Sequence, residues 1–497
     1  MKKQRLRSCL CAILLSTLAP ATMAMPAAAM RVDWSHPTGV SAATPTLQVV
    51  VNPMLRPGSH ISARAFAALR RLRANTVRFV PWLPYPRLAV AELRPPTRRK
   101  TFWNFRLIDP MVRRFMHATS GQPVIMNFST IPEWLYQTPK PVTFPKNPNQ
   151  VFWGYEQGTQ LRKHGLRKVA NYYARLVSWY TRGGFRDELG HWHASGHHYH
   201  FAWWEVLNEV DFEHHTTVQQ YTRMYDAITA AIHRVSPRTR FVGLALGNPT
   251  ASLGWFSYFL NHRNHKPGVP LDMISYHFYA QPGNAPPAAW PHLFFTQARG
   301  FLATVKTIQA IRQKLSPNTQ TDIDEIGSIL ANDTAPRLAK PIPTMYWNLS
   351  GAMYAYLYAH LATMGVQYAG ESQLIGYPSQ FPSVSMVNWK TGVPNARFRV
   401  LELLRRHFGP GDKIVPAQGA PAGVFAQGFI TPNGVRELLL INKRNAPVTM
   451  PVAGMRGGTE YWVDQKTGGG QPRQRGMFGN RIRLGGLAVA VVTLKRK

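Results

Sequence analysis

The chain has 497 residues, of which 45% are hydrophobic, and its formal net charge is +35 at pH 7. This length exceeds one ordinary domain and suffices for a barrel of roughly 250 to 400 residues with a smaller second domain. After the N-terminal segment, no run of about 20 apolar residues occurs, which argues against a transmembrane helix. The arginines are scattered and accompany no recognised nucleic-acid module, which argues against nucleic acid as a partner.

The N-terminal segment, residues 1–24, predicts a secretory signal peptide. Four Lys and Arg residues within the first seven positions precede an apolar stretch over 12–18, and Thr22 and Ala24 suit cleavage after Ala24. Cleavage after Ala29 is the alternative. We therefore expect an exported protein, periplasmic or extracellular. Both cysteines, Cys9 and Cys11, lie in this segment, so we expect the mature chain to have no disulfide and no thiolate metal site.

Eight strand-like segments alternate with helical segments between residues 46 and 411. The predicted strands lie at 47–51, 76–80, 123–127, 201–207, 240–244, 273–276, 320–323 and 366–369. The alternation predicts a parallel sheet, and eight such units predict a closed (β/α)8 TIM barrel of the α/β class. Over residues 412–497, short strand-like runs separated by turn residues predict a small β-sandwich. Residues 25–45 are a candidate extra strand of this sandwich.

The most informative segment is Trp203-Trp204-Glu205-Val206-Leu207-Asn208-Glu209, in which a buried strand ends in an amide and a carboxyl group. Side chains at the C-terminal ends of barrel strands point into the active site. Three strands later, another strand-like run ends in Glu325. A retaining glycosidase needs two carboxyl groups about 5 to 5.5 Å apart. We assign Glu209 as general acid/base and Glu325 as nucleophile, because Asn208 can bind the sugar 2-hydroxyl beside Glu209.

The chain resembles clan A glycoside hydrolases, and most closely family 39, which includes β-xylosidases, α-L-iduronidases and exopolysaccharide endoglycosidases. The similar stretches are 75–79, 103–109, 131–134, 204–209, 275–279, 324–327, 387–392 and 394–397. Two departures accompany this resemblance. Leu207 and Val210 replace a Trp and a Pro that many members have, and Val80 stands where a sugar-contacting His is expected. The resemblance therefore implies the family's catalytic pair, with a cleavage-site sugar other than xylose or iduronate.

Three further residues near the predicted nucleophile are candidate substrate-binding residues. Arg78, at the end of the second strand, could bind Glu325 and keep it ionised, since an opposite charge favours the charged form. A structural ion pair elsewhere is the alternative. His277 and Tyr279 follow the sixth strand and could contact the nucleophile or a sugar hydroxyl, with plain packing as the alternative.

Other candidates are farther from the predicted pair. Glu371, just past the eighth strand, could bind substrate hydroxyls or form a salt bridge. Trp134 and Trp82 could provide apolar platforms for sugars, although core packing is the commoner role of a single Trp.

The histidines between 191 and 200 suggest a metal site, but they precede the fourth strand and should lie opposite the active site. Solvated or packed histidines are the favoured interpretation, and His214 and His215 are better placed to contact substrate. We predict no metal and no cofactor.

The leading hypothesis is an exported retaining glycoside hydrolase that acts on an oligosaccharide or polysaccharide, with a β-linkage favoured. A carbohydrate-binding protein on an inactive barrel and an envelope-polysaccharide transglycosylase are the alternatives. The positive charge fits either an acidic polysaccharide substrate or an acidic or anionic envelope environment. The sequence leaves open the sugar, the linkage, endo or exo action, and the oligomeric state.

Overall fold

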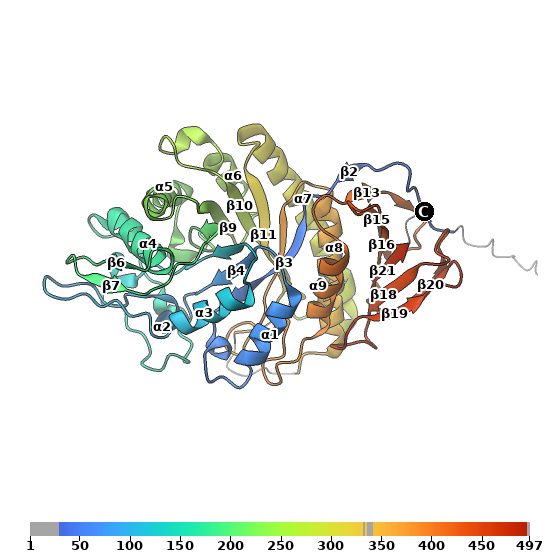
Figure 1. The fold of residues 1–497 in the computed structure, drawn as a ribbon, viewed down its shortest axis with the longest axis horizontal. Helices are drawn as coiled ribbons and strands as arrows, with labels where there is room; N and C mark the ends of the chain where they lie inside the picture. Colours follow the sequence, from blue (N-terminus) through green and yellow to red (C-terminus); the bar gives the residue numbers. More distant parts are fainter. Residues whose placement is uncertain (1–28, 332, 335–340, 495–497) are drawn as a thin grey trace, which may run out of the picture.

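The computed structural model describes residues 29–331, 333–334 and 341–494 (Figure 1). The predicted signal peptide, residues 1–24, lies outside the described residues. Within the part of the chain that is described, no helix combines the length and the apolar character needed to span a membrane.

A closed barrel of eight parallel strands forms the centre of the molecule. In spatial order its strands are β3 (Thr44–Val50), β4 (Val77–Val80), β5 (Val124–Met126), β8 (Trp203–Glu205), β9 (Arg240–Leu246), β10 (Met273–Ala280), β11 (Gln320–Ser328) and β12 (Tyr368–Glu371). All eight predicted strands are present, and the predicted (β/α)8 barrel is confirmed. Strand β3 begins earlier than predicted. Pro45 has no N–H to donate to a neighbouring strand. It is tolerated in β3 because only β12 pairs with this part of the strand, and β4 pairs with β3 from Gln48 onward.

Helices surround the barrel as the alternation predicts. The main ones are α1 (Ser62–Leu72), α3 (Asp109–Ala118), α4 (Gly165–Thr181), α5 (Val218–Val235), α6 (Leu253–Phe259), α7 (Trp290–Leu315), α8 (Thr344–Ala362) and α9 (Ala396–His407). Short helix α2 (Pro86–Ala89) follows β4. Helix α5 starts with a capping box in which Thr217 and Gln220 satisfy each other's backbone N–H groups. Helix α4 buries Val169, Tyr172 and Leu176 on one face, at the helical spacing of its sequence.

The C-terminal region forms a two-layered β domain beside the barrel. A seven-stranded antiparallel sheet contains, in order, β19 (Arg473–Gly476), β18 (Thr459–Val463), β21 (Val489–Leu494), β16 (Arg436–Asn442), β15 (Val424–Ile430), β13 (Lys413–Val415) and β2 (Gly39–Val40). The second layer consists of two small sheets. Strand β17 (Val448–Pro451) pairs with β20 (Arg481–Leu484), and β1 (Arg31–Val32) pairs with β14 (Ala417–Gln418). Leu438, Leu440 and Ile482 belong to the core between the layers.

Helix α8 explains how this domain is attached. The helix lies between the barrel and the large sheet, and nearly all of its residues are buried (Figure 1). Its sequence is therefore apolar on every side, as expected for a helix with no solvent-facing stripe. The barrel and the inner face of the large sheet share one hydrophobic core, to which Phe429, Leu439 and Val491 contribute.

Candidate active site

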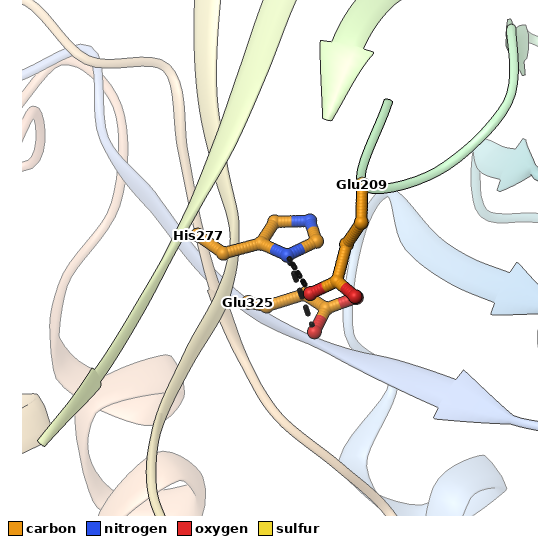
Figure 2. A group of neighbouring side chains, drawn as sticks. All are labelled: Glu209, His277 and Glu325. Atoms are coloured by element: carbon orange, nitrogen blue, oxygen red, sulfur yellow. Dashed lines mark hydrogen bonds and ion pairs between the residues drawn. The ribbon is translucent and has the colours of Figure 1, made fainter. Parts of the chain in front are cut away.

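Glu209 and Glu325 face each other across the mouth of the barrel (Figure 2). Glu209 lies in the turn that follows β8, and Glu325 lies within β11. The nearest oxygens of these carboxylates and one nitrogen of His277 all lie within 4.8 Å of one another. Both glutamates line a cavity of about 930 Å³. The folded chain thus brings the two predicted catalytic carboxylates to a separation that one sugar ring can span.

An irregularity in β11 directs two adjacent side chains to the same side. Ser275 of β10 pairs with Asp322, whereas His277 pairs with Glu325, so β11 contains one extra residue at this point. Such a bulge changes the side-chain alternation of a strand. As a result, Asp324 and Glu325 both contact Arg78, although consecutive residues of a regular strand point to opposite faces.

Arg78 is the cation at the floor of the site. Its Nη1 lies 2.6 Å from Glu325 Oε1, and its Nε lies 3.0 Å from Asp324. It also forms an ion pair with Glu205 and is almost fully buried. Burial alone would disfavour the charged guanidinium, but these carboxylates raise the pKa of Arg78 well above its ordinary value. One positive charge therefore stabilises three carboxylates.

Tyr279 and His277 complete the surroundings of the carboxyl pair. The Tyr279 hydroxyl donates to Glu325 Oε2 at 2.5 Å and contacts the Ser372 hydroxyl at 2.6 Å. His277 Nδ1 lies 3.2 Å from Glu209 Oε1 and 3.6 Å from Glu325 Oε2. Burial disfavours the imidazolium, but Glu325 and Asp324 outweigh burial and raise the pKa of His277 well above its ordinary value. His277 is therefore a charged donor between the two glutamates.

The orientation of the Asn208 amide follows from its neighbours. Arg78 Nη2, which can only donate, lies 2.6 Å from one amide atom of Asn208, so that atom is the oxygen. The Nδ2 group then points toward Glu213 Oε1 at 3.5 Å. Glu213 also accepts a hydrogen bond from Trp82 Nε1 at 2.8 Å. Asn208 therefore presents a donor at the wall of the cavity beside Glu209.

The turn that carries Asn208 and Glu209 is strained. Leu207 and Glu209 have φ values of 67° and 42°, a region that costs of order 1–3 kcal/mol for residues other than glycine. Two hydrogen bonds hold this turn: Asn127 Nδ2 donates to the Leu207 carbonyl at 3.0 Å, and the Glu209 N–H donates to the Ala245 carbonyl at 2.9 Å. This turn carries the Glu209 side chain at the cavity wall.

Several residues of this network were not predicted from the sequence. They are Glu205 and Asp324, which pair with Arg78, and Gln48 and Ser372, which connect Arg78 to Tyr279. The available signal was a charged residue inside an otherwise apolar strand, which applies to Glu205. Burial raises the pKa of Glu205 to about 7, although Arg78 opposes this effect.

Aromatic and uncharged polar side chains form most of the cavity wall. Trp82 and Phe381 stack with ring centroids 6.2 Å apart on one side, and Phe278 and Phe301 stack at 4.5 Å on another. Among the wall residues that the structure describes, none is Lys or Arg. Such a surface suits sugar rings, which offer apolar faces and hydroxyl edges.

Two predicted substrate-binding residues lie elsewhere. Glu371 is fully buried, forms an ion pair with Arg397 at 3.0 Å as the salt-bridge alternative predicts, and does not line the cavity. A buried carboxylate at the end of β12 needs such a cation. Trp134 lies in the 3-10 helix Glu133–Leu135, donates to the Glu92 carbonyl at 2.8 Å and does not line the cavity. Trp82, by contrast, lines it.

The histidine-rich segment folds away from the cavity. His193 contacts Asp187 at 2.9 Å in the hairpin of β6 (Gly184–Arg186) and β7 (Trp192–Ala194), and His197 packs on Tyr180. His214 stacks on Tyr136, and burial lowers the pKa of His214 to about 4. Within the described residues, the one group whose donor atoms converge as metal ligands do is Glu209, His277 and Glu325. Arg78 and protonated His277 already supply positive charge there, which opposes cation binding.

Comparisons with known proteins agree with this arrangement. A family model described as "Glycosyl hydrolases family 39" matches residues 88–342. A search of curated protein sequences found no match. Three of the similar solved structures are a GH51 arabinofuranosidase from Xanthomonas axonopodis pv. citri, a glucosidase from Croceicoccus marinus and a GH30 endoxylanase from Clostridium papyrosolvens.

The likeness to these structures extends over the whole fold. The arabinofuranosidase has a TM-score of 0.61 at 11% identity, and the match covers 94% of this chain and 99% of that one. The glucosidase has a TM-score of 0.59 at 14% identity, covering 95% and 99%. The endoxylanase has a TM-score of 0.55 at 13% identity, covering 94% and 99%. At these identities the matches establish the shared fold.

Proposed function

The chain belongs to glycosyl hydrolase family 39, whose model matches more than half of its length, and we propose that it is an exported retaining glycosidase. Its substrate is an oligosaccharide or polysaccharide, and a two-glutamate double displacement cleaves the glycosidic bond. Family membership supports glycosidase activity. The mechanism, the residue roles and the export rest on the local arguments that follow.

In the first half-reaction, Glu325 attacks the anomeric carbon while Glu209 protonates the departing oxygen. Arg78 and Tyr279 fix Glu325 from two directions, so that its carboxylate approaches the carbon in one orientation. Asn208 Nδ2 can bind the sugar 2-hydroxyl, a contact that strengthens as positive charge develops on the ring. The products of this step are a glycosyl ester on Glu325 and the released leaving group.

In the second half-reaction, water attacks the glycosyl ester, and Glu209, now ionised, accepts a proton from this water. The bond between the anomeric carbon and Glu325 breaks, which regenerates both starting carboxyl states. The two inversions together retain the configuration of the anomeric carbon.

A single observation carries the retaining assignment. The nearest oxygens of Glu209 and Glu325 lie within 4.8 Å, whereas inverting enzymes separate their carboxyl groups by about 6.5–9.5 Å to admit a water molecule. The observed gap supports direct attack by Glu325.

The proposal can be tested by trapping the covalent intermediate. A panel of 2,4-dinitrophenyl 2-deoxy-2-fluoro-glycosides should inactivate the protein with one glycone, and peptide mass spectrometry should locate the label on Glu325. Hydrolysis of the matching aryl glycoside, followed by NMR, should give the retained anomer first. An inverted first product, or a label on another residue, would contradict the mechanism.

Export is proposed from the sequence of residues 1–24. A fusion of residues 1–35 to alkaline phosphatase should give periplasmic phosphatase activity, whereas a fusion in which the basic residues Lys2, Lys3, Arg5 and Arg7 are replaced by Glu should not. Equal activity of the two fusions would contradict export through this segment.

A further inference from the structure

Phe212 is an exposed aromatic side chain at the edge of the catalytic cavity. It lies three residues after Glu209, and 54% of its surface is exposed although it lines the cavity. Its N–H donates to the Glu209 carbonyl at 2.7 Å, so the ring and the carboxyl group belong to one tight turn. A large apolar side chain left exposed beside a catalytic group is a candidate binding surface.

Gly247 leaves the space that Phe212 occupies. A Cβ atom at this position would lie 2.6 Å from the Phe212 ring and 3.0 Å from Glu209 Oε1. The ring and the carboxyl group therefore meet at the same point of the wall. Asp211 fixes the loop there, because its carboxylate accepts hydrogen bonds from the N–H groups of Gly247 and Asn248 at 2.9 Å each. These hydrogen bonds fix the turn that carries Phe212 against the loop that carries Gly247.

The position of Phe212 identifies the part of the substrate that it can contact. The general acid must lie beside the departing oxygen, and the nucleophile must lie beside the anomeric carbon. Phe212 and Gly247 adjoin Glu209, whereas Glu325 is surrounded by Arg78 and Tyr279. A ring stacked on Phe212 is therefore the sugar on the leaving-group side.

Beyond Glu209, three polar side chains of this wall are uncharged. Asn248, Thr250 and Gln281 line it, and among the described wall residues none is Lys or Arg. Burial and the charge of Glu209 raise the pKa of Glu156, and burial and Glu156 raise the pKa of Glu213, which favours the neutral form of both carboxyl groups. A sugar carboxylate placed here would lose water without a Lys or Arg of the described wall to pair with it, which is costly in a partly desolvated cavity.

We propose that Phe212, residues 247–250 and Gln281 form a subsite for the leaving-group sugar, and that this sugar is uncharged. This inference rests on the proposed retaining mechanism. Within the described residues, the positive charge of the chain then does not act by binding an acidic sugar next to the scissile bond.

The test uses the trapped 2-fluoroglycosyl protein described above. A sugar bound in the leaving-group subsite accelerates reactivation: its hydroxyl oxygen attacks the anomeric carbon, the bond to Glu325 breaks, and Glu209 takes the hydroxyl proton. Methyl β-glucoside and methyl β-glucuronide are the acceptors. The rate of reactivation by water alone is the reference, because the covalent bond to Glu325 is then cleaved with no sugar in the subsite.

We expect methyl β-glucoside to accelerate reactivation at least about tenfold more than methyl β-glucuronide. Phe212→Ala should reduce the acceleration by the glucoside, measured relative to reactivation of the same variant by water, roughly tenfold, the scale of one lost aromatic contact. Phe212→Trp should retain most of it. The matched control is Phe478→Ala, which removes an aromatic ring that is 94% exposed and lies outside the cavity wall.

Three results would overturn the subsite. They are undiminished acceleration in Phe212→Ala, an equal loss in Phe478→Ala, and faster reactivation with the glucuronide than with the glucoside. Failure to form a trapped protein with any glycone would instead contradict the proposed function, so the two failures are distinguishable.

Discussion

The surroundings of Glu325 and Glu209 differ sharply, although we assign the two side chains to one reaction. Glu325 receives hydrogen bonds from Arg78 at 2.6 Å and from Tyr279 at 2.5 Å, and its side chain is 10% exposed. Within the described residues, Glu209 has one side-chain partner, His277 at 3.2 Å, and its side chain is 25% exposed. A nucleophile gains from a fixed position and a nearby cation, whereas a general acid/base must exchange protons with water. The asymmetry therefore matches the two assigned roles.

Replacement of the proposed nucleophile should reduce activity more than replacement of Glu209, Arg78 or Glu156. Glu325→Ala should lose activity on the order of 10⁵–10⁶-fold, the scale on which loss of a covalent nucleophile acts in other hydrolases. Azide should restore turnover of an aryl glycoside and give the glycosyl azide of inverted configuration, because the ion attacks from the face that Glu325 leaves empty. Rates and product configuration can be measured by absorbance and NMR. Retained configuration in the azide product would assign the nucleophile to another residue.

Removing the acid/base should have a smaller effect that depends on the leaving group. Glu209→Ala should reduce activity on substrates with poor leaving groups on the order of 10²–10⁴-fold, and far less on activated aryl glycosides. Azide should here attack the glycosyl ester and give a product of retained configuration. Steady-state kinetics across aryl glycosides of graded leaving-group pKa would measure the dependence. An equal loss on all of them, with no response to azide, would contradict the assignment.

Arg78 and Arg397 offer a matched pair for separating catalysis from stability. Both are buried and ion-paired, Arg78 with Glu325 in the cavity and Arg397 with Glu371 outside it. Arg397→Met should lower the free energy of unfolding by about 3–5 kcal/mol, because it leaves one buried carboxylate unpaired. Arg78→Met should lower it at least as much, because it removes the cation that three carboxylates share. Urea denaturation measures this.

Activity should distinguish the two variants. Of the two variants, only Arg78→Met should lower kcat of the folded fraction, because Arg78 contacts the proposed nucleophile and Arg397 does not. Should Arg78→Met fail to fold, Arg78→Lys keeps the charge but loses the forked contact with Asn208 and Glu325. Unchanged kcat in the lysine variant would show that the fork is not required.

The barrel and the catalytic pair could be predicted from local sequence, since strand patterning and strand-end carboxyl groups are short-range signals. The bulge in β11 could not, because it depends on how β10 and β12 pair with this strand. A regular strand would place Asp324 on the face opposite Glu325. The sequence left two roles open for Glu371 for a related reason: its partner Arg397 follows in α9, and only the closed fold brings them together.

The contact between Phe212 and Gly247 at the cavity wall also could not be predicted from local sequence. They lie in loops after different strands, and neither residue has a sequence signature of its own. Their contact depends on the fixed turn after β8 and on the Asp211 hydrogen bonds to the next loop. Long-range packing of this kind determines the cavity wall, whereas the sequence pattern determines which strand ends surround it.

Replacement of Glu156, on the Glu209 side of the cavity, should have the smallest effect of these changes. Burial and the charge of Glu209 raise the pKa of Glu156 to about 8. The folded protein therefore keeps this proton in a pH range where the unfolded chain, with a glutamate pKa of about 4.3, has lost it. Since the folded state binds more protons there, the free energy of unfolding should fall as pH rises from about 4.3 to about 8.

Glu156→Gln cannot titrate, so its stability relative to the natural protein should increase between pH 5 and pH 8. At pH 5 its activity should stay within about threefold of the natural protein, because both side chains are neutral there. Urea denaturation at pH 5, 6.5 and 8 measures the trend. Glu188→Gln in the β6–β7 hairpin, which loses a carboxylate paired with Arg175, is the control. A stability difference that is flat across these pH values would mean that Glu156 is ionised in the folded state, and that the Glu209 side of the cavity is as charged as the Glu325 side.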